Sequence, residues 1–171
     1  MVETANFPKR TLLGLSVAFI SIQQQNSNAA EKIGPLWGQM SSLFFNHPEL
    51  GRENPIGVGA MWPIEGGAAG EMQYFAGYEV SEPPQDLGGL EVLEIPSGDY
   101  AFATHRGPLH DLATTVQDFY TNKLPSSKLE RRPGMDLEIY IATGEASEVV
   151  IAAPVILSSW TDEDSLILFS A

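Results

Sequence analysis

The 171-residue sequence contains no cysteine. Disulfides, thiolate zinc sites and cysteine nucleophiles are therefore excluded, and the redox compartment cannot be inferred. Basic residues are also scarce: 9 Lys and Arg stand against 22 Asp and Glu, for a formal net charge of −13. Nucleic-acid binding depends on clustered Lys and Arg that neutralise phosphates, so this balance argues against direct contact with nucleic acid. An acidic surface instead attracts cationic small molecules or a basic partner.

Recognisable enzyme motifs are absent as well. The sequence has no G-x-S-x-G elbow, no phosphate-binding loop and no H-E-x-x-H pair. Gly57-Val58-Gly59 lacks the third glycine of a nucleotide-binding loop and predicts a strand that another part of the chain approaches closely. His105 and His110 are five positions apart across Gly107-Pro108, a spacing unsuited to a metal pair on one helix. We expect surface or loop histidines, no metal and no cofactor.

The longest apolar stretch, residues 11–22, is too short for the roughly 18 residues of a membrane-spanning helix. Lys9-Arg10 before it and the small residues 27–30 after it resemble a secretory signal peptide. The alternation of apolar and small residues over 13–19 instead favours a buried strand. We expect a strand here, and a cytoplasmic protein with no membrane contact.

Two amphipathic segments predict helices. The first covers about residues 28–45, with a capping box beginning at Asn28 and with Pro35 marking either a kink or the true first turn. The second covers residues 108–124 and is expected to stop before Pro125.

Strands are expected between and after these helices. The predicted ranges are 56–62, 72–80, 90–95, 99–105, 137–142 and 149–155. Residues 96–98, Pro-Ser-Gly, are interpreted as a bend within one long strand covering 90–105.

The order strand, helix, strand, strand therefore occurs twice, at an offset of about 80 residues. The predicted fold class is α+β: a duplicated strand-helix-strand-strand module forms one antiparallel sheet, with two helices on one face and a central ligand groove. We expect a single domain over 1–171, with halves at about 11–82 and 88–156 and a tail at 157–171.

One carboxylate interrupts an apolar strand. Glu138 lies within the run Leu137–Ala142 and, by the period of two, shares its face with Tyr140. Two interpretations remain open. Glu138 marks the solvent face of an amphipathic strand, or it is a groove carboxylate surrounded by aromatic rings that receives an organic cation.

Five short stretches resemble the effector-binding domain of bacterial transcription activators, the gyrase-inhibitor-like small-molecule-binding family. In chain order they are Pro35–Trp37, Tyr74–Val80, Ile95–Ala101, Leu124–Ser127 and Leu137–Tyr140. The resemblance covers most of the chain from about 11 to 155. It implies the same duplicated fold, with a central pocket for lipophilic, often cationic, aromatic compounds and with Glu138 as the counter-charge. The chain differs from the best-known relatives in having no DNA-binding helix-turn-helix before this domain, so a transcriptional role would need a partner.

The expected ligand-binding residues come from two sources. The resemblance gives Glu138, Tyr140, Trp37, Tyr74 and Phe75, and strand parity adds Trp62, Tyr100 and Phe102. No catalytic residue is assigned.

Three functions are compatible with these residues. The leading hypothesis is a stand-alone binding protein for amphipathic aromatic cations that senses or sequesters them. The alternative is a hydrolase of electrophilic toxins in the same pocket, with Glu138 as general base and Tyr140 or Tyr100 as proton donor. The third is an interaction protein that uses its acidity against a basic partner such as gyrase. A DNA-binding protein or gyrase in trans is the expected macromolecular partner, and the chain is a monomer or a homodimer.

Overall fold

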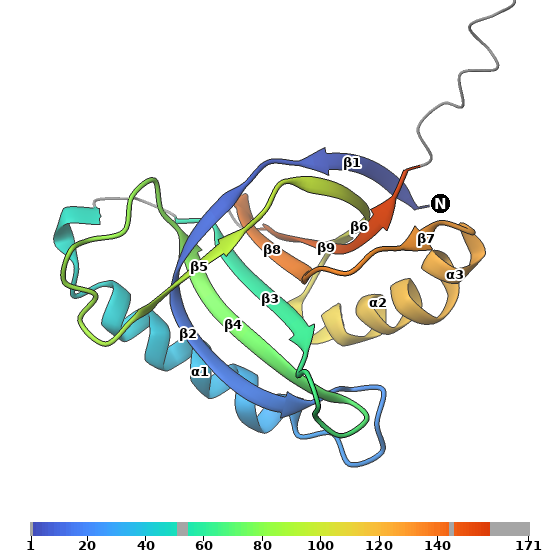
Figure 1. The fold of residues 1–171 in the computed structure, drawn as a ribbon, viewed down its shortest axis with the longest axis horizontal. Coiled ribbons are helices and arrows are strands. Elements are labelled where there is room, and N and C mark those ends of the chain that lie inside the picture. Colours follow the sequence, from blue (N-terminus) through green and yellow to red (C-terminus); the bar gives the residue numbers. More distant parts are fainter. Residues whose placement is uncertain (1, 51–54, 144–145, 158–171) are drawn as a thin grey trace, which may run out of the picture.

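One curved antiparallel sheet organises the chain in the computed structural model, which describes residues 2–50, 55–143 and 146–157 (Figure 1). The predicted tail beyond residue 157 lies outside the described residues. The strand order is β1-β6-β9-β8-β3-β4-β2-β5, and the short β7 pairs with β9. The strands are β1 (Glu3–Phe7), β2 (Arg10–Ile20), β3 (Gly57–Pro63), β4 (Glu71–Glu79), β5 (Glu91–Ile95), β6 (Gly98–Arg106), β7 (Glu130–Arg131), β8 (Asp136–Thr143) and β9 (Ala146–Ile156).

Two helical segments cover one face of this sheet. The first is α1 (Ala29–Phe44), which packs on β2 and β4 and is followed by a 3-10 turn at Pro48–Leu50. The second comprises a 3-10 turn (Leu109–Asp111), α2 (Leu112–Asp118), a π-helical turn (Phe119–Lys123) and α3 (Leu124–Ser126). It packs through Val116, Phe119 and Leu124 on β6 and β9. Among the described residues, no helix combines the length and hydrophobicity needed to cross a bilayer.

The two halves of the sheet have the same arrangement of strands and helix. In one half, α1 packs on β2 and β4, and β3 is the innermost strand. In the other half, the second helical segment packs on β6 and β9, β8 is the innermost strand, and the halves join where β3 pairs with β8. In that central pairing Gly59 lies opposite Glu138. Because each helical segment covers the outer strands of its own half, the middle of the sheet is left between them. The predicted fold class is confirmed.

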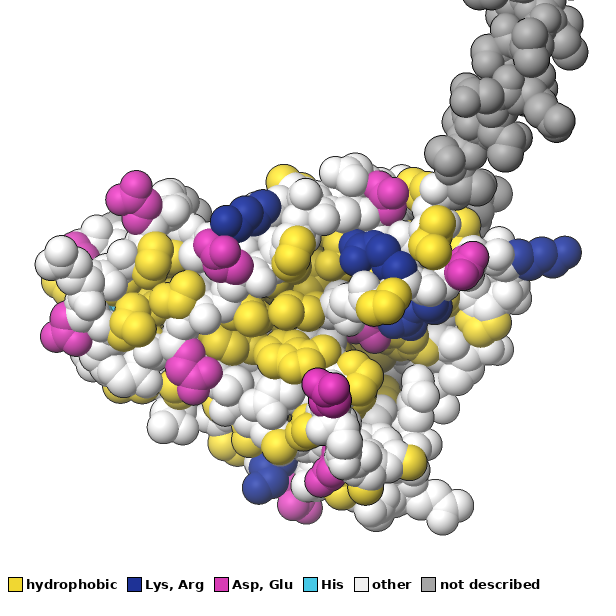
Figure 2. Space-filling view, in the orientation of Figure 1, with side chains coloured by type: hydrophobic (Ala, Val, Ile, Leu, Met, Phe, Trp, Pro, Cys, Tyr) yellow, Lys and Arg dark blue, Asp and Glu magenta, His cyan; other side chains and the backbone are white. Residues whose placement is uncertain are grey.

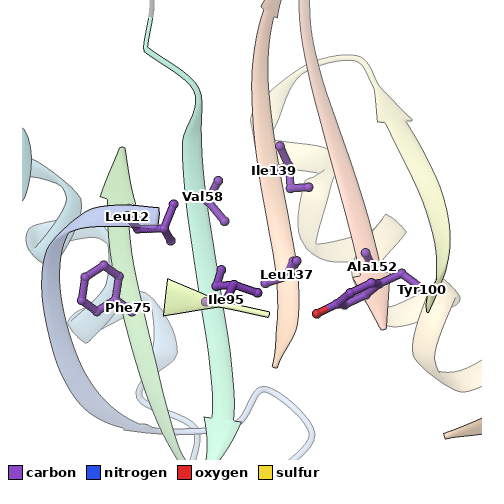
Figure 3. Packing of buried hydrophobic residues seen from close by; sticks show 9 residues of the cluster. Leu12, Val58, Phe75, Ile95, Tyr100, Leu137, Ile139 and Ala152 are labelled. Carbon is purple, nitrogen blue, oxygen red and sulfur yellow. The ribbon is translucent and has the colours of Figure 1, made fainter. Parts of the chain in front are cut away.

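The face opposite the helices, here called the inner face, carries a separate apolar core (Figure 3). It brings together buried side chains from both halves: Leu12, Val58, Ala60, Phe75, Ile95, Tyr100, Leu137, Ile139 and Ala152. Figure 2 shows hydrophobic side chains gathered across the middle of this side of the molecule, over β3 and β4. The sheet is therefore apolar on both faces, which is why its strands contain few alternating charges.

β2 (Arg10–Ile20) is the strand that the alternation over residues 13–19 predicted. β5 and β6 run beside β2 and β1 in the same register on both sides of Pro96-Ser97, from Gly14 opposite Glu91 to Glu3 opposite Phe102. Residues 96–98 therefore bend one long extended stretch, as predicted, and beyond the bend β6 also pairs with β9. Sequence analysis missed β1, whose five residues begin with the polar pair Glu3-Thr4.

The cap of the first helical segment and the end of the second differ from prediction. Pro35 lies inside α1, so of its two predicted roles that of marking the first turn is excluded. The side chain of Asn28 does not cap the helix, because its Oδ1 accepts the backbone N–H of Ile20 at 2.7 Å instead. The second segment continues past Pro125 to Ser126, since the π-helical turn ahead of it places this proline near the start of a new turn, where its missing N–H is tolerated.

His105 is buried rather than on the surface. Its side chain, on β6, is held between Thr115 Oγ1, 2.8 Å from Nδ1, and the carbonyl oxygen of Pro108, 3.1 Å from Nε2. The residue therefore fastens the second helical segment to the sheet, and the expectation of a surface or loop histidine was wrong here.

Substituting Gly14 tests the tight pairing of β2. Gly14 lies opposite Gly77 of β4 and Glu91 of β5, and a Cβ at this position would overlap the carbonyl oxygen of Ala76. We expect Gly14→Ala to lower the free energy of unfolding by about 1–3 kcal/mol in urea titrations, as over-packed sites do. The matched control is Gly38→Ala in α1, where nothing lies within 4 Å, and it should instead gain about 0.5–1 kcal/mol. Equal stability of Gly14→Ala and wild type would contradict the close packing.

Candidate functional site

A groove of about 700 Å³ lies between the two helical segments on the helix-covered face of the sheet. Small-molecule sites commonly enclose about 300–1,000 Å³, so this groove has room for a drug-sized compound. Its wall residues include Ala29 and Ile33 from α1, Val116 and Tyr120 from the second segment, and Met61 and Glu138 from the central strands. The lining is largely apolar and includes two carboxylates, Glu138 and Asp136.

Glu138 is held by two tyrosine hydroxyls. Tyr140, two residues along β8, donates to Glu138 Oε2 at 2.9 Å. Tyr74 from β4 donates to the same oxygen at 3.4 Å, and its own hydroxyl oxygen accepts the indole N–H of Trp37 at 3.0 Å. The indole of Trp37 also packs edge-on against the ring of Tyr140. Side chains from α1, β4 and β8 therefore fix one carboxylate in place.

The surroundings of Glu138 shift its pKa in opposite directions. Burial raises the pKa of Glu138, and the hydrogen bonds from Tyr140 and Tyr74 oppose that rise. Burial and the neighbouring carboxylate raise the pKa of both tyrosines, so they stay protonated and act as donors. Among the residues that the structure describes, no basic side chain forms an ion pair with Glu138.

Two glycines of β3 make room for this arrangement. A Cβ at Gly59 would overlap the hydroxyl of Tyr74, and a Cβ at Gly57 would come within 3.3 Å of the Trp37 ring. The Gly57-Val58-Gly59 stretch is thus a place of close approach, as predicted. The atoms that approach are the aromatic side chains that position Glu138.

A second carboxylate, Asp136, lines the same groove two residues before Glu138. Its Oδ1 accepts the guanidinium of Arg131 at 2.6 Å, and its side chain is 16% exposed. Burial raises the pKa of Asp136 to about 6 even though Arg131 and Tyr120 lower it. Sequence analysis missed this residue. The available signal was its position, since residues two apart on a strand share a face.

Four of the expected site residues lie away from Glu138. Phe75 and Tyr100 belong to the buried core of the inner face (Figure 3). Trp62 and Phe102 pack against that core. Phe75 follows Tyr74 directly, and adjacent residues of a strand point to opposite faces, so the two cannot both face Glu138. For Trp62, Tyr100 and Phe102, the alternation along the strands was assigned to the face of Glu138, whereas these side chains lie at the inner face. The structure thus brings together Glu138, Tyr140, Tyr74 and Trp37, and separates Phe75, Trp62, Tyr100 and Phe102 from them.

Replacing Tyr140 tests whether its hydroxyl stabilises the ionised form of Glu138. Tyr140→Phe removes the shorter of the two hydrogen bonds, and a hydrogen bond to a charged group is worth roughly 1.5–3 kcal/mol. We expect the pKa of Glu138, followed by NMR of its side-chain carboxyl carbon, to rise by about 1–2 units.

The matched control is Tyr78→Phe. Tyr78 lies on β4 of the same sheet, and its hydroxyl forms a hydrogen bond with Ser41 of α1 rather than with Glu138. An unchanged pKa in Tyr140→Phe, or an equal rise in both variants, would contradict the proposed support of the carboxylate.

Asp136 makes folding stability depend on pH. Its pKa is about 6 in the folded protein, above the ordinary 3.8 expected for the unfolded chain, so the folded state binds more protons between these values. Stability therefore falls as pH rises from about 4 to 6, by about 3 kcal/mol once Asp136 is fully ionised. We expect Asp136→Asn to remove this part of the decline when urea unfolding is measured at pH 4.5 and 7.5. If the free energy of unfolding changes equally with pH in the variant and in wild type, the fold does not disfavour the ionised form of Asp136.

Comparisons with known proteins point to one family. The model of the GyrI-like small molecule binding domain matches residues 16–151. The transcriptional regulator BrlR of Pseudomonas aeruginosa is 29% identical over 124 residues, which are 71% of this chain and 43% of that protein. The chain thus spans less than half the length of this relative.

Two solved structures have a similar fold. One is SAV2435 bound to tetraphenylphosphonium, with a TM-score of 0.66 and 14% identity over 91% of this chain and 94% of that one. The other is an integron cassette protein of Vibrio cholerae, with a TM-score of 0.68 and 18% identity over 91% and 95%. At these identities they show the fold alone. Since the family model covers most of the sequence, the chain belongs to the GyrI-like small-molecule-binding family.

Proposed function

We propose that this protein binds lipophilic aromatic cations in the groove between its helical segments, with Glu138 as the counter-charge. The observation that carries the proposal is the carboxylate of Glu138, fixed by Tyr140 and Tyr74 within an apolar groove and given no basic partner by the described residues. That SAV2435, which has a similar fold, has been solved with tetraphenylphosphonium supports this ligand class.

The chemistry of binding follows from how the carboxylate is held. Both tyrosines donate to Oε2, so Oε1 is the oxygen that we expect a ligand to meet. A bound cation lowers the pKa of Glu138 again and compensates the burial of its charge. A ring such as that of Tyr120 beside the cation adds roughly 0.5–2 kcal/mol, and burial of the ligand's apolar surface supplies the rest. Such a protein senses or sequesters its ligand.

A series of ligands with similar shape and different charge tests the role of Glu138. The probes are the tetraphenylphosphonium cation, the tetraphenylborate anion of nearly the same shape, and neutral triphenylphosphine oxide. In thermal unfolding at pH 7.5, a ligand at about 100 times its Kd stabilises the fold by roughly 2.7 kcal/mol. We expect the cation to raise the Tm of wild type by several degrees and the anion to have no effect. Glu138→Gln should lose the cation response and keep that to the neutral compound.

The matched control is Glu94→Gln, which removes an exposed carboxylate paired with Lys9 outside the groove. It should respond as wild type does. Equal losses for the cation and the neutral compound in Glu138→Gln would remove the counter-charge role, because they would reflect a damaged groove.

Hydrolysis in the same groove is the second candidate. The raised pKa of Glu138 favours it, because a base that activates water works best when its pKa lies near the working pH. Mass spectrometry of a strained electrophile after incubation distinguishes the two functions. Product that forms with wild type and not with Glu138→Gln indicates turnover, whereas recovery of unchanged compound from wild type argues against hydrolysis.

A further inference from the structure

The second carboxylate of the groove is paired with a cation of the protein itself. Asp136 accepts Arg131 at 2.6 Å, and the guanidinium carbon of Arg131 lies 6.0 Å from the centre of the Tyr120 ring. Tyr120 and Asp136 both line the groove that contains Glu138. A carboxylate and an aromatic ring that both lie next to one positive group form the arrangement that recognises organic cations. The protein's own guanidinium thus shows that a cation fits at this position.

Arg131 can leave this position easily. It lies on the two-residue strand β7, and 43% of its side chain is exposed, against 16% for Asp136. An ion pair with an exposed partner contributes little to stability, since water solvates the released guanidinium. If Arg131 moved out, Asp136 would remain partly buried beside Tyr120 as a carboxylate without a cationic partner. Among the described residues, Glu138 likewise forms no ion pair with a cation.

The two carboxylates are spaced for one ligand. Asp136 and Glu138 are alternate residues of β8 on the same face of the sheet, so their Cα atoms are about 7 Å apart. Two cationic groups joined by one aromatic ring match this spacing. A ligand that makes both contacts gains from the second one without a further loss of translational freedom.

We propose that Asp136 and Tyr120 form a second cation subsite in the groove, occupied by Arg131 when the groove is empty, and that the preferred ligands are aromatic compounds with two cationic groups. The second group takes the place of Arg131 between Tyr120 and Asp136. This inference rests on the proposed function at Glu138, and the experiment distinguishes the failure of one from the failure of the other.

The test compares a dication with its matched monocation. The probes are the p-xylylene-bridged bis(pyridinium) dication and the (4-methylbenzyl)pyridinium monocation, titrated by isothermal calorimetry at pH 7.5. We expect wild type to bind the dication at least about ten times more tightly. In Asp136→Asn this ratio should fall to about two, the statistical advantage of two equivalent ends. In Arg131→Gln it should rise, because the competing guanidinium is gone.

The control is Asp118→Asn, which removes a carboxylate of α2 that pairs with Lys123 and does not line the groove. It should keep the wild-type ratio. Arg131→Gln tests the subsite independently if Asp136→Asn proves unfolded in a thermal melt.

The outcomes separate the two claims. The second subsite is overturned if wild type binds the dication no more than twice as tightly as the monocation. It is also overturned if wild type binds neither probe measurably. An Arg131→Gln variant that binds the dication more weakly than wild type overturns it as well. If Glu138→Gln leaves the affinity for the monocation unchanged, the proposed function fails, while the ratio in Asp136→Asn still reports on Asp136.

Discussion

An ionised carboxylate in an apolar groove is unfavourable unless hydrogen bonds or a counter-charge compensate it, and this constraint shapes the centre of the protein. Glu138 receives two tyrosine hydroxyls on one oxygen, and the Trp37 indole fixes one of those tyrosines in turn. The donors come from different elements, so the carboxylate is positioned only when α1, β4 and β8 have packed together. Gly57 and Gly59 belong to the same arrangement, because side chains there would collide with the rings that position Glu138.

The duplicated architecture explains why the groove lies where it does. Each helical segment packs mainly over the outer strands of its own half, and Trp37 of α1 reaches the central pair at Gly57 of β3 and Tyr140 of β8. The space above the rest of the junction is bounded by two helical walls and a sheet. The core on the inner face joins both halves through side chains of β2, β3, β4, β5, β6, β8 and β9. The helix-covered face thus combines packed helices with a groove between them.

Sequence patterns predicted what depends on local periodicity and missed what depends on long-range pairing. Alternation identified the strands around Leu13 and Glu138, and the offset between like elements predicted the joined halves. Which strands pair is not encoded locally, so β1, whose partner β6 lies far along the chain, was missed.

The same limit applies within the site. Tyr74 was assigned correctly to the face of Glu138, whereas Phe75, Tyr100, Trp62 and Phe102 required knowledge of how the faces of separate strands align. Asp136 was missed because an aspartate at the first position of a strand looks like a turn residue in sequence. Its partner Arg131 comes from another element, and no spacing pattern predicts that contact.

The residues that break local patterns are the ones that converge on the groove. A glutamate in an apolar strand, two glycines in another strand and two tyrosines with buried hydroxyls are each unfavourable choices for folding alone. Taken together they are consistent, because the glycines admit the rings, and the rings donate to the carboxylate. The compensation is still incomplete, since the pKa of Glu138 and that of Asp136 remain raised in the folded protein. In the proposed function, a cation from outside relieves what the fold leaves uncompensated. We therefore expect the ligand's charge, more than its shape, to determine what this site selects.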